Sequence, residues 1–291
     1  IEEVFYEPSK VKVPDFLPDT PECRAEIAQY HQSCSRIDQG LGHLVSLLKE
    51  TGQWDNTVLI YTADHGMAFP GGKTTVYEAG LRVPFIVRHP EAKKRGVVNN
   101  AMISHVDITP SILDLAKAYD PERRAPLKLI NVAKVPSGEN GGKPAKAYHG
   151  RSWAPILEET SPKGWNEIGA SHTFHEIQMY YPMRVVRDRK YKLIWNIAWR
   201  QPYPFASDLW RASTWQAQFA KGAEAPYGKR TVDSYINRPQ FELYDISSDP
   251  SEARNLAEDP AFATVLTHYQ SKLKTMQKRT EDPWIMKWRY E

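Results

Sequence analysis

The chain has 291 residues, of which 41% are hydrophobic and 25% charged, so it can bury a sizeable core and belongs to the ordinary globular class. Its net charge is +3, from 38 basic and 35 acidic residues, and it has no arginine-rich stripe, which argues against a nucleic-acid partner. No segment approaches the roughly 20 apolar residues that a membrane span needs. Disordered, fibrous and membrane-spanning classes are therefore disfavoured.

The first residues indicate that the chain is part of a longer protein. Ile1 stands where an initiator methionine is expected, and residues 1–20 are proline-rich, which favours an extended segment. The first strong strand pattern appears only near residue 57. We therefore expect further sequence upstream of Ile1.

A long helix is predicted after the extended segment. Thr20, Pro21 and Glu22 suit the cap and first turn of a helix, and apolar residues then recur at steps of three and four as far as Leu48. Gly52 is a typical stop signal. Cys23 and Cys34 would lie about 16 Å apart on this helix, so they are predicted to be buried thiols without a disulfide.

A short strand follows and ends in a polar pair. Val58–Tyr61 is an apolar, β-branched run that predicts a strand buried on both faces of a parallel sheet. Asp64 and His65 come directly after it, at the strand end where α/β sheets place their ligands. Both side chains can bind a divalent cation, although the same residues also suit a turn with local hydrogen bonds. Lys73, in the glycine-rich loop beyond, is an anion-binding candidate or a solvated loop lysine.

The rest of the chain alternates between helix and strand signals. The segment 104–118 predicts a second helix, and 119–147 is rich in lysine, proline and glycine and predicts a long loop. Further predicted elements are strands at Met183–Val186, Lys192–Trp195 and Phe241–Asp245 and a helix within 259–278. We expect an α/β domain at 1–150 and a smaller antiparallel subdomain with a terminal helix at 151–291.

The motifs around the first strand resemble those of the sulfatase family of the alkaline-phosphatase superfamily. The residues that carry the resemblance are Asp64–Gly66, Lys73 and Tyr77–Pro84, with Ser104–Pro110 and Phe241–Asp245 further along. The resemblance implies an alkaline-phosphatase-like α/β sandwich, with a mixed sheet between helices, that is truncated at its N-terminus. A smaller C-terminal antiparallel α+β subdomain would complete the fold.

Three further segments are similar to one branch of that family, which removes N-linked sulfate from glucosamine of the heparan or heparin type. They are His175–Glu176, Met179–Arg184 and Asp282–Trp284. The resemblance implies a hydrolase that acts on a sulfated sugar in glycosaminoglycan degradation. It also implies a periplasmic or secreted location in a bacterium-like source, or a lysosomal one in a eukaryote.

By position, the resemblance assigns roles to the residues near the first strand. Asp64 and His65 would be ligands of one Ca²⁺ ion shared with ligands from the N-terminal part, and Lys73 would contact a sulfate oxygen. Glu78 and Arg82 are expected to form a structural ion pair that packs the loop.

Four residues of the smaller subdomain are candidates for substrate binding. His172, His175, Glu176 and Arg184 would contact the hydroxyls or the amino nitrogen of the sugar. The alternative is that they are polar turn residues, with one histidine on a packed face.

The nucleophile is not in this chain. Sulfatases use a formylglycine made from cysteine or serine in a Cys/Ser-x-Pro-x-Arg motif, and the residues around Cys34 lack both the proline and the arginine at that spacing. We therefore expect the N-terminal part of the protein to supply the nucleophile and the remaining ligands. Two alternatives stay open: a metal-dependent phosphate mono- or diesterase of the same superfamily, and a non-catalytic sugar-binding fragment.

Overall fold

The computed structural model describes residues 1–122, 125–126, 148–176 and 179–290. These residues form two compact units. The first comprises Ile1–Glu91, Gly169–Lys278 and Pro283–Glu291, and the second comprises Ala92–Ile168 and Arg279–Asp282. The predicted division at residue 150 stays a prediction, and most of the long loop expected at 119–147 lies outside the described residues.

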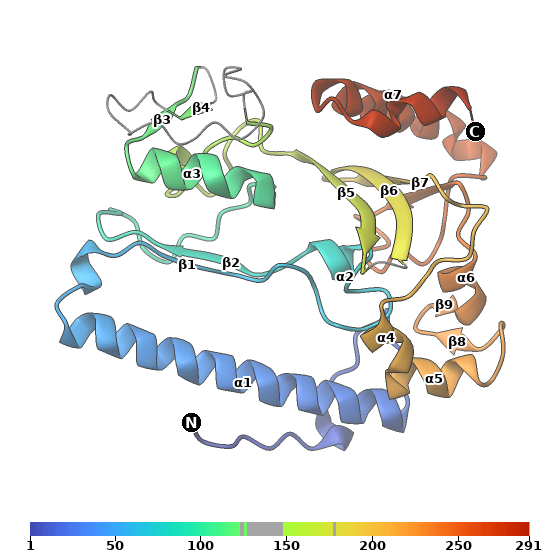
Figure 1. Cartoon of the computed structure of the whole chain (residues 1–291), viewed down its shortest axis with the longest axis horizontal. Coiled ribbons are helices and arrows are strands. Elements are labelled where there is room, and N and C mark those ends of the chain that lie inside the picture. The colour runs from blue at the N-terminus through green and yellow to red at the C-terminus, as the bar shows by residue number, and fades with distance from the viewer. Residues whose placement is uncertain (123–124, 127–147, 177–178, 291) are drawn as a thin grey trace. The chain divides into compact units, whose positions relative to one another are not determined.

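The first unit is built around a four-stranded sheet with the strand order β10-β7-β6-β5 (Figure 1). The ladders from β6 to β7 and from β7 to β10 are antiparallel, with Val185 opposite Ile194 and Leu243 opposite Leu193. They confirm the strands predicted at Met183–Val186, Lys192–Trp195 and Phe241–Asp245 and their antiparallel pairing. Their bounds are β5 Glu167–His175, β6 Met179–Asp188, β7 Tyr191–Asn196 and β10 Phe241–Asp245.

Successive side chains along these strands point to opposite faces of the sheet, and both faces are buried. Leu193 and Trp195 pack into one core with Tyr269 and Leu273 of helix α7 (Ala263–Arg279). Ile194 faces a second core, which residues from several short elements complete. Those elements are α4 Ser207–Arg211, α5 Ser213–Phe219, β8 Pro226–Tyr227 and α6 Val232–Ile236, and β9 Arg230–Thr231 pairs with β8.

Helix α1 runs from Pro21 to Glu50, and Thr20 caps it by accepting a hydrogen bond from the backbone N–H of Cys23 at 3.3 Å. This confirms the predicted helix and its start. Only its first turns are buried, and Cys34 is exposed although a buried thiol was predicted. The apolar spacing predicted the helix correctly. In the described part of the chain, however, other residues bury only its first turns, so an apolar-face position such as Cys34 is left exposed. Both cysteines are free, as expected.

Strand β1 (Leu59–Thr62) confirms the strand predicted before Asp64, but not its surroundings. It pairs antiparallel with β2 (Phe85–Arg88), and all four of its residues are partly exposed. The prediction of a parallel strand buried on both faces was therefore wrong for the described chain. An apolar run indicates a strand, but it carries no information about the direction of the partner strand. The helix α2 (Glu78–Leu81) lies between β1 and β2 in sequence.

The second unit contains helix α3 (Ile108–Leu115), which confirms the helix predicted in 104–118. Ser104 and Asp107 form a capping box before it, and the Asp107 carboxylate also accepts the backbone N–H of Arg151 at 2.8 Å. Gly150 must lack a side chain, because a Cβ there would lie 2.0 Å from the carbonyl oxygen of Val106. The two remaining strands are β3 Tyr119–Asp120 and β4 Ala125–Pro126.

Short 3₁₀ segments link these elements. They span Pro8–Lys10, Trp54–Asn56, His105–Asp107, Ala154–Ile156, Pro260–Phe262 and Pro283–Arg289.

Buried ion pairs join the loop between β1 and β2 to the four-stranded sheet. Glu78, at the start of α2, accepts two hydrogen bonds from Arg187 of β6, both of 2.9 Å, and lies 3.2 Å from the ammonium of Lys192 on β7. Lys192 is fully buried and lies 2.8 Å from Glu252, whose other carboxylate oxygen accepts the backbone N–H of Glu78. We call Glu78, Arg187, Lys192 and Glu252 the charged clamp.

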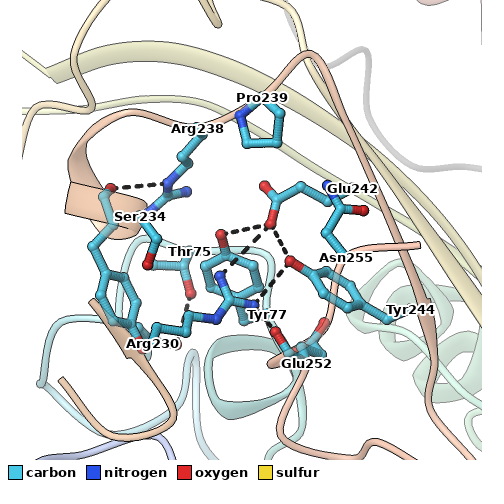
Figure 2. Close-up of polar contacts among 12 residues, drawn as sticks. Thr75, Tyr77, Arg230, Ser234, Arg238, Pro239, Glu242, Tyr244, Glu252 and Asn255 are labelled. Atoms are coloured by element: carbon cyan, nitrogen blue, oxygen red, sulfur yellow. Dashed lines mark hydrogen bonds and ion pairs between the residues drawn. The ribbon is translucent and has the colours of Figure 1, made fainter. Parts of the chain in front are cut away.

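A second buried polar group lies beside the clamp (Figure 2). The carboxylate of Glu242 accepts hydrogen bonds from the phenols of Tyr77 and Tyr244, and Arg230 lies 3.6 Å from it. Arg230 also stacks on the ring of Tyr77 at 4.0 Å. Although burial would raise the pKa of Glu242, the guanidinium groups of Arg230 and Arg238 hold it below its ordinary value. Glu242 is therefore ionised within the core.

Replacing Lys192 by methionine should destabilise the protein severely, because two buried carboxylates would lose their shared cation. Breaking a buried ion pair in this way typically costs about 3–5 kcal/mol of unfolding free energy. Chemical denaturation of the Lys192→Met variant measures the loss. Lys190→Met, at the exposed neighbouring lysine, is the matched control and should change stability little. Equal stabilities for the two variants would contradict the role of the clamp.

Candidate functional site

Asp64 and His65 form a compact turn directly after β1. The Asp64 carboxylate accepts the backbone N–H of His65 at 3.0 Å and is 88% exposed. Nδ1 of His65 lies 2.8 Å from the carbonyl oxygen of Gly66 and donates to it, so Nε2 is the ring nitrogen that remains for a ligand. Nε2 lies 3.5 Å from the second carboxylate oxygen of Asp64. The local hydrogen bonds thus leave two atoms near each other that could be metal ligands, one carboxylate oxygen of Asp64 and Nε2 of His65.

Two donors are too few for a calcium site. Ca²⁺ takes roughly six to eight oxygen ligands, and an imidazole is a poor substitute for one of them. Among the described residues, no group of three or more His, Cys, Asp and Glu side chains is placed to hold a metal ion. Asp64 and His65 therefore fit a divalent ion only as part of a larger ligand set.

Lys73 lies in the loop between β1 and α2 and is held from a distant segment. Its ammonium is 2.6 Å from the carboxylate of Asp208, in the first turn of α4. Burial would raise the pKa of Asp208, but the hydrogen bond and charge of Lys73 lower it below the ordinary value. The lysine is thus neither free in solvent nor fully neutralised, because its single carboxylate partner is half exposed.

The same helix also contacts the turn after β5. The hydroxyl of Ser207 donates to the Glu176 carboxylate at 3.1 Å, and Nε2 of His175 lies 3.9 Å from that carboxylate. Glu176 has a φ of +54°, a conformation that non-glycine residues rarely adopt outside tight turns. Adjacent residues at the start of α4 therefore contact two distant parts of the chain, since Asp208 binds Lys73 and Ser207 binds Glu176.

His172 and Arg184 are more deeply placed. Nδ1 of His172 lies 3.1 Å from the carbonyl oxygen of Tyr181, and the Arg184 guanidinium donates to the carbonyl oxygen of His172 at 3.1 Å. Arg184 is 5% exposed and stacks on Trp284 at 4.7 Å. Burial lowers the pKa of His172 below its ordinary value. These contacts stabilise the β5–β6 hairpin.

Glu78 has a structural role, as predicted, but not with the predicted partner. Its carboxylate pairs with Arg187 and Lys192, while the side chain of Arg82 is exposed. The prediction rested on how often arginine–carboxylate pairs organise a fold. However, Arg82 is the residue at which α2 ends, and Glu78 points into the sheet instead.

No sequence motif singled out Asp208, Ser207 or Tyr203. They lie in the aromatic segment 199–215, for which no regular element was predicted. The only local signal is an aspartate in a short helix's first turn, which is typical of any helix start. Asp208 and Tyr203 contact residues 135 and 129 positions away, and Ser207 contacts a residue 31 positions away, and spacing within one segment does not reveal such contacts.

A partly exposed lysine with a half-exposed carboxylate partner is suited to binding an anionic ligand, and a histidine and a glutamate contacted through the same short helix are suited to binding hydroxyl groups. Residues 5–118 match the family model described as sulfatase. The chain therefore contains a sulfatase family domain.

Named relatives extend the match over nearly the whole chain. The chain is 35% identical to the human N-sulphoglucosamine sulphohydrolase over 283 residues, which are 96% of this chain and 53% of that protein. It is 25% identical to an ulvan-active sulfatase of Formosa agariphila over 95% of this chain and 41% of that protein. The chain therefore spans about half the length of the curated relatives it matches.

Solved structures confirm the fold. One neighbour is a protein solved in complex with its substrate D-glucosamine-2-N,6-O-disulfate, with a TM-score of 0.60 and 21% identity over 92% of this chain and 44% of that one. The α/β, alkaline-phosphatase-like fold is therefore the fold of this chain. Sulfatases generally hold a divalent metal ion. No helix in the described part of the chain is long and apolar enough to cross a membrane.

The buried imidazole of His172 should make stability fall as the solution becomes acidic. Because the folded state lowers the pKa of His172, the unfolded chain binds a proton more readily once the pH falls below about 6.5. His172→Asn keeps a donor near the position of Nδ1 but cannot be protonated. The slope of unfolding free energy against pH, between about pH 7 and 5, should be smaller for this variant.

His268→Asn, at an exposed histidine, is the comparison variant, and an equal change of slope in both variants would show that the effect is not specific to His172. An identical slope for wild type and His172→Asn would show that this imidazole does not titrate differently in the folded state.

Proposed function

We propose that this chain forms one side of the active site of a sulfatase that hydrolyses N-linked sulfate from glucosamine in a heparan-type glycosaminoglycan. The observation that carries the proposal is the 35% identity, over 96% of the chain, to a relative named N-sulphoglucosamine sulphohydrolase. A structural neighbour whose substrate is a glucosamine disulfate supports the substrate class. The contacts around Lys73 support the chemistry.

Lys73 would bind the sulfuryl group. As the bond from sulfur to nitrogen breaks, negative charge develops on the sulfuryl oxygens, and a fixed ammonium stabilises that charge more than it stabilises the substrate. Only one of the three donors of the ammonium is needed for Asp208, so two remain for the sulfuryl oxygens.

Asp64 and His65 would hold a divalent ion, with Ca²⁺ as the ion we propose. The free carboxylate oxygen of Asp64 and Nε2 of His65 are the donors that their local hydrogen bonds leave available. When bound, such an ion supplies positive charge beside the sulfate. The remaining ligands would come from residues outside the described set.

His175 and Glu176 would contact the sugar. Both side chains are about one-third exposed, and a carboxylate beside an imidazole can accept and donate hydrogen bonds to hydroxyl groups or to the amino nitrogen. His172 and Arg184 would shape the same subsite from behind, since they support the strands on either side of this turn.

We further propose that the N-terminal part of the same protein supplies a formylglycine nucleophile and the missing ligands. Half of the length of the relatives lies outside the match, and this chain has no formylglycine motif. Exposed apolar side chains offer a surface for that part: Ile37, Leu44 and Leu47 on α1 and Ile86 on β2. A periplasmic, secreted or lysosomal location is part of this proposal.

The substrate class is tested with the intact protein that contains this chain. Released inorganic sulfate is measured with N-sulfoglucosamine and with glucosamine 6-O-sulfate, and phosphate release with a nitrophenyl phosphate ester. We expect the highest kcat/KM for N-sulfoglucosamine. A preference for the phosphate ester would support the phosphoesterase alternative, and binding of sulfated sugar without any turnover would support a sugar-binding fragment.

Replacing Lys73 by alanine should lower kcat by about 10²- to 10³-fold, which is the usual effect of removing one group that stabilises transition-state charge. Lys73→Arg should recover part of the loss because it restores the charge. Lys190→Ala, at an exposed lysine, should retain wild-type kcat. An unchanged kcat in Lys73→Ala would contradict the proposed role of Lys73.

Replacing Asp64 by asparagine should raise the Ca²⁺ concentration needed for half-maximal activity, because a neutral amide oxygen binds a hard cation less tightly than a carboxylate. Titration of the metal-depleted intact protein with Ca²⁺ measures this. Asp55→Asn removes another exposed aspartate near β1 and should leave the titration unchanged. Identical Ca²⁺ titrations for Asp64→Asn and wild type would exclude Asp64 as a ligand.

A further inference from the structure

The turn that carries Lys73 is held at two adjacent residues by one distant segment. Asp208 binds the ammonium of Lys73, and the hydroxyl of Tyr203 donates to the carbonyl oxygen of Thr74 at 2.7 Å. The same hydroxyl lies 3.1 Å from Oγ1 of Thr74. Two contacts from residues only five positions apart therefore act on consecutive residues of the turn.

The turn itself is strained. Thr74 has a φ of +63°, which is unfavourable for a β-branched residue and persists only where surrounding contacts enforce it. Gly72, two positions before Thr74, must lack a side chain, since a Cβ there would lie 2.3 Å from the carbonyl oxygen of Met67. That carbonyl accepts the backbone N–H of Lys73 at 2.8 Å. The backbone conformation is therefore restricted on both sides of Lys73, by close packing at Gly72 and by the enforced positive φ at Thr74.

Tyr203 is well anchored for this task. Its ring is 3% exposed, and the guanidinium of Arg238 stacks on it at 3.5 Å. Its backbone N–H donates to the carbonyl oxygen of Ile236 at 2.7 Å. Asp208, by contrast, is half exposed. One contact therefore fixes the backbone from the core, while the other holds the side chain at the surface.

We propose that Tyr203 and Asp208 are positioning residues that orient the ammonium of Lys73 towards an anionic ligand. The inference deepens the proposed function and rests on it for the identity of that ligand as a sulfate group. Lysine has four rotatable side-chain bonds, so an unheld ammonium would sample many positions. Tyr203 holds the backbone from which the Lys73 side chain extends, and Asp208 holds the ammonium at its end.

The arrangement makes kcat and ground-state affinity respond differently. Asp208 partly neutralises Lys73, and this weakens the attraction of the lysine for any anion in the ground state. Removing the negative charge should therefore leave anion binding as tight or make it tighter. It should also lower kcat, because an ammonium that is no longer oriented stabilises the transition state less well.

The kinetic test compares Asp208→Asn and Tyr203→Phe with wild type in the intact protein, using N-sulfoglucosamine as substrate and inorganic sulfate as inhibitor. We expect kcat to fall roughly tenfold or more in each variant. The inhibition constant of sulfate should be unchanged or lower in Asp208→Asn. Asp19→Asn breaks an exposed aspartate–arginine pair at the start of α1 and should behave as wild type.

An unchanged kcat in both variants would overturn the inference. So would a loss of kcat in Asp208→Asn that is accompanied by weaker sulfate binding, since this is the pattern of general damage to the site. Thermal melting of each variant establishes that it is folded. If Asp208→Asn does not fold, Tyr203→Phe still tests the inference, because it keeps the buried ring and removes only the hydroxyl.

A second measurement does not depend on turnover. The carboxyl carbon of Asp208 is titrated by NMR in wild type and in Lys73→Met, and its pKa should be higher in the variant because the cation that lowers it is gone. Equal pKa values would show that the pair does not form and would overturn the inference. If the pKa of Asp208 is higher in Lys73→Met but the intact protein has no sulfatase activity, the Lys73–Asp208 pair is supported and only the proposed function is contradicted.

Discussion

The charged clamp is the interaction on which the arrangement of the site depends. Glu78 begins the short helix that follows the Lys73 loop, and Arg187 and Lys192 belong to the two central strands of the sheet. These pairs fix the start of α2 against the sheet, whereas β1 and β2 form only a two-stranded ladder with no buried residue. Ion pairs are directional where apolar contacts are not, and this allows a loop with little core of its own to take one position.

A second consequence of the clamp is that it brings the loop near the aromatic core. Tyr77 precedes Glu78 and inserts its ring between the cations Arg230 and Arg238, with its phenol on Glu242 (Figure 2). The same core holds Tyr203, which reaches back to Thr74. The turn that carries Lys73 is therefore fixed at both ends: on one side by Tyr203 and on the other by the residues that lead into α2.

Much of the fold could be predicted from the sequence because its signals are local. The cap at Thr20 and the strand at Phe241–Asp245 each follow from neighbouring residues and were found at their predicted positions. The exposure of Cys34 and the antiparallel partner of β1 were not predictable in this way, since both depend on what packs against an element. The site divides similarly: Lys73 stands in a recognisable motif, whereas Asp208 is identified only by a contact across 135 positions.

Comparison of two lysines shows how the surroundings decide between a structural and a functional role. Lys192 has no exposed surface and lies within 3.2 Å of two carboxylates, so its charge is fully used inside the protein. Lys73 keeps 16% of its side chain exposed and has one half-exposed carboxylate partner, so part of its charge remains available to a ligand. A buried cation with two anions stabilises a fold, and a cation with one anion at the surface can hold a third group. The position of Asp208 therefore does more than secure a loop, because it also offsets part of the positive charge that Lys73 would present to an anion.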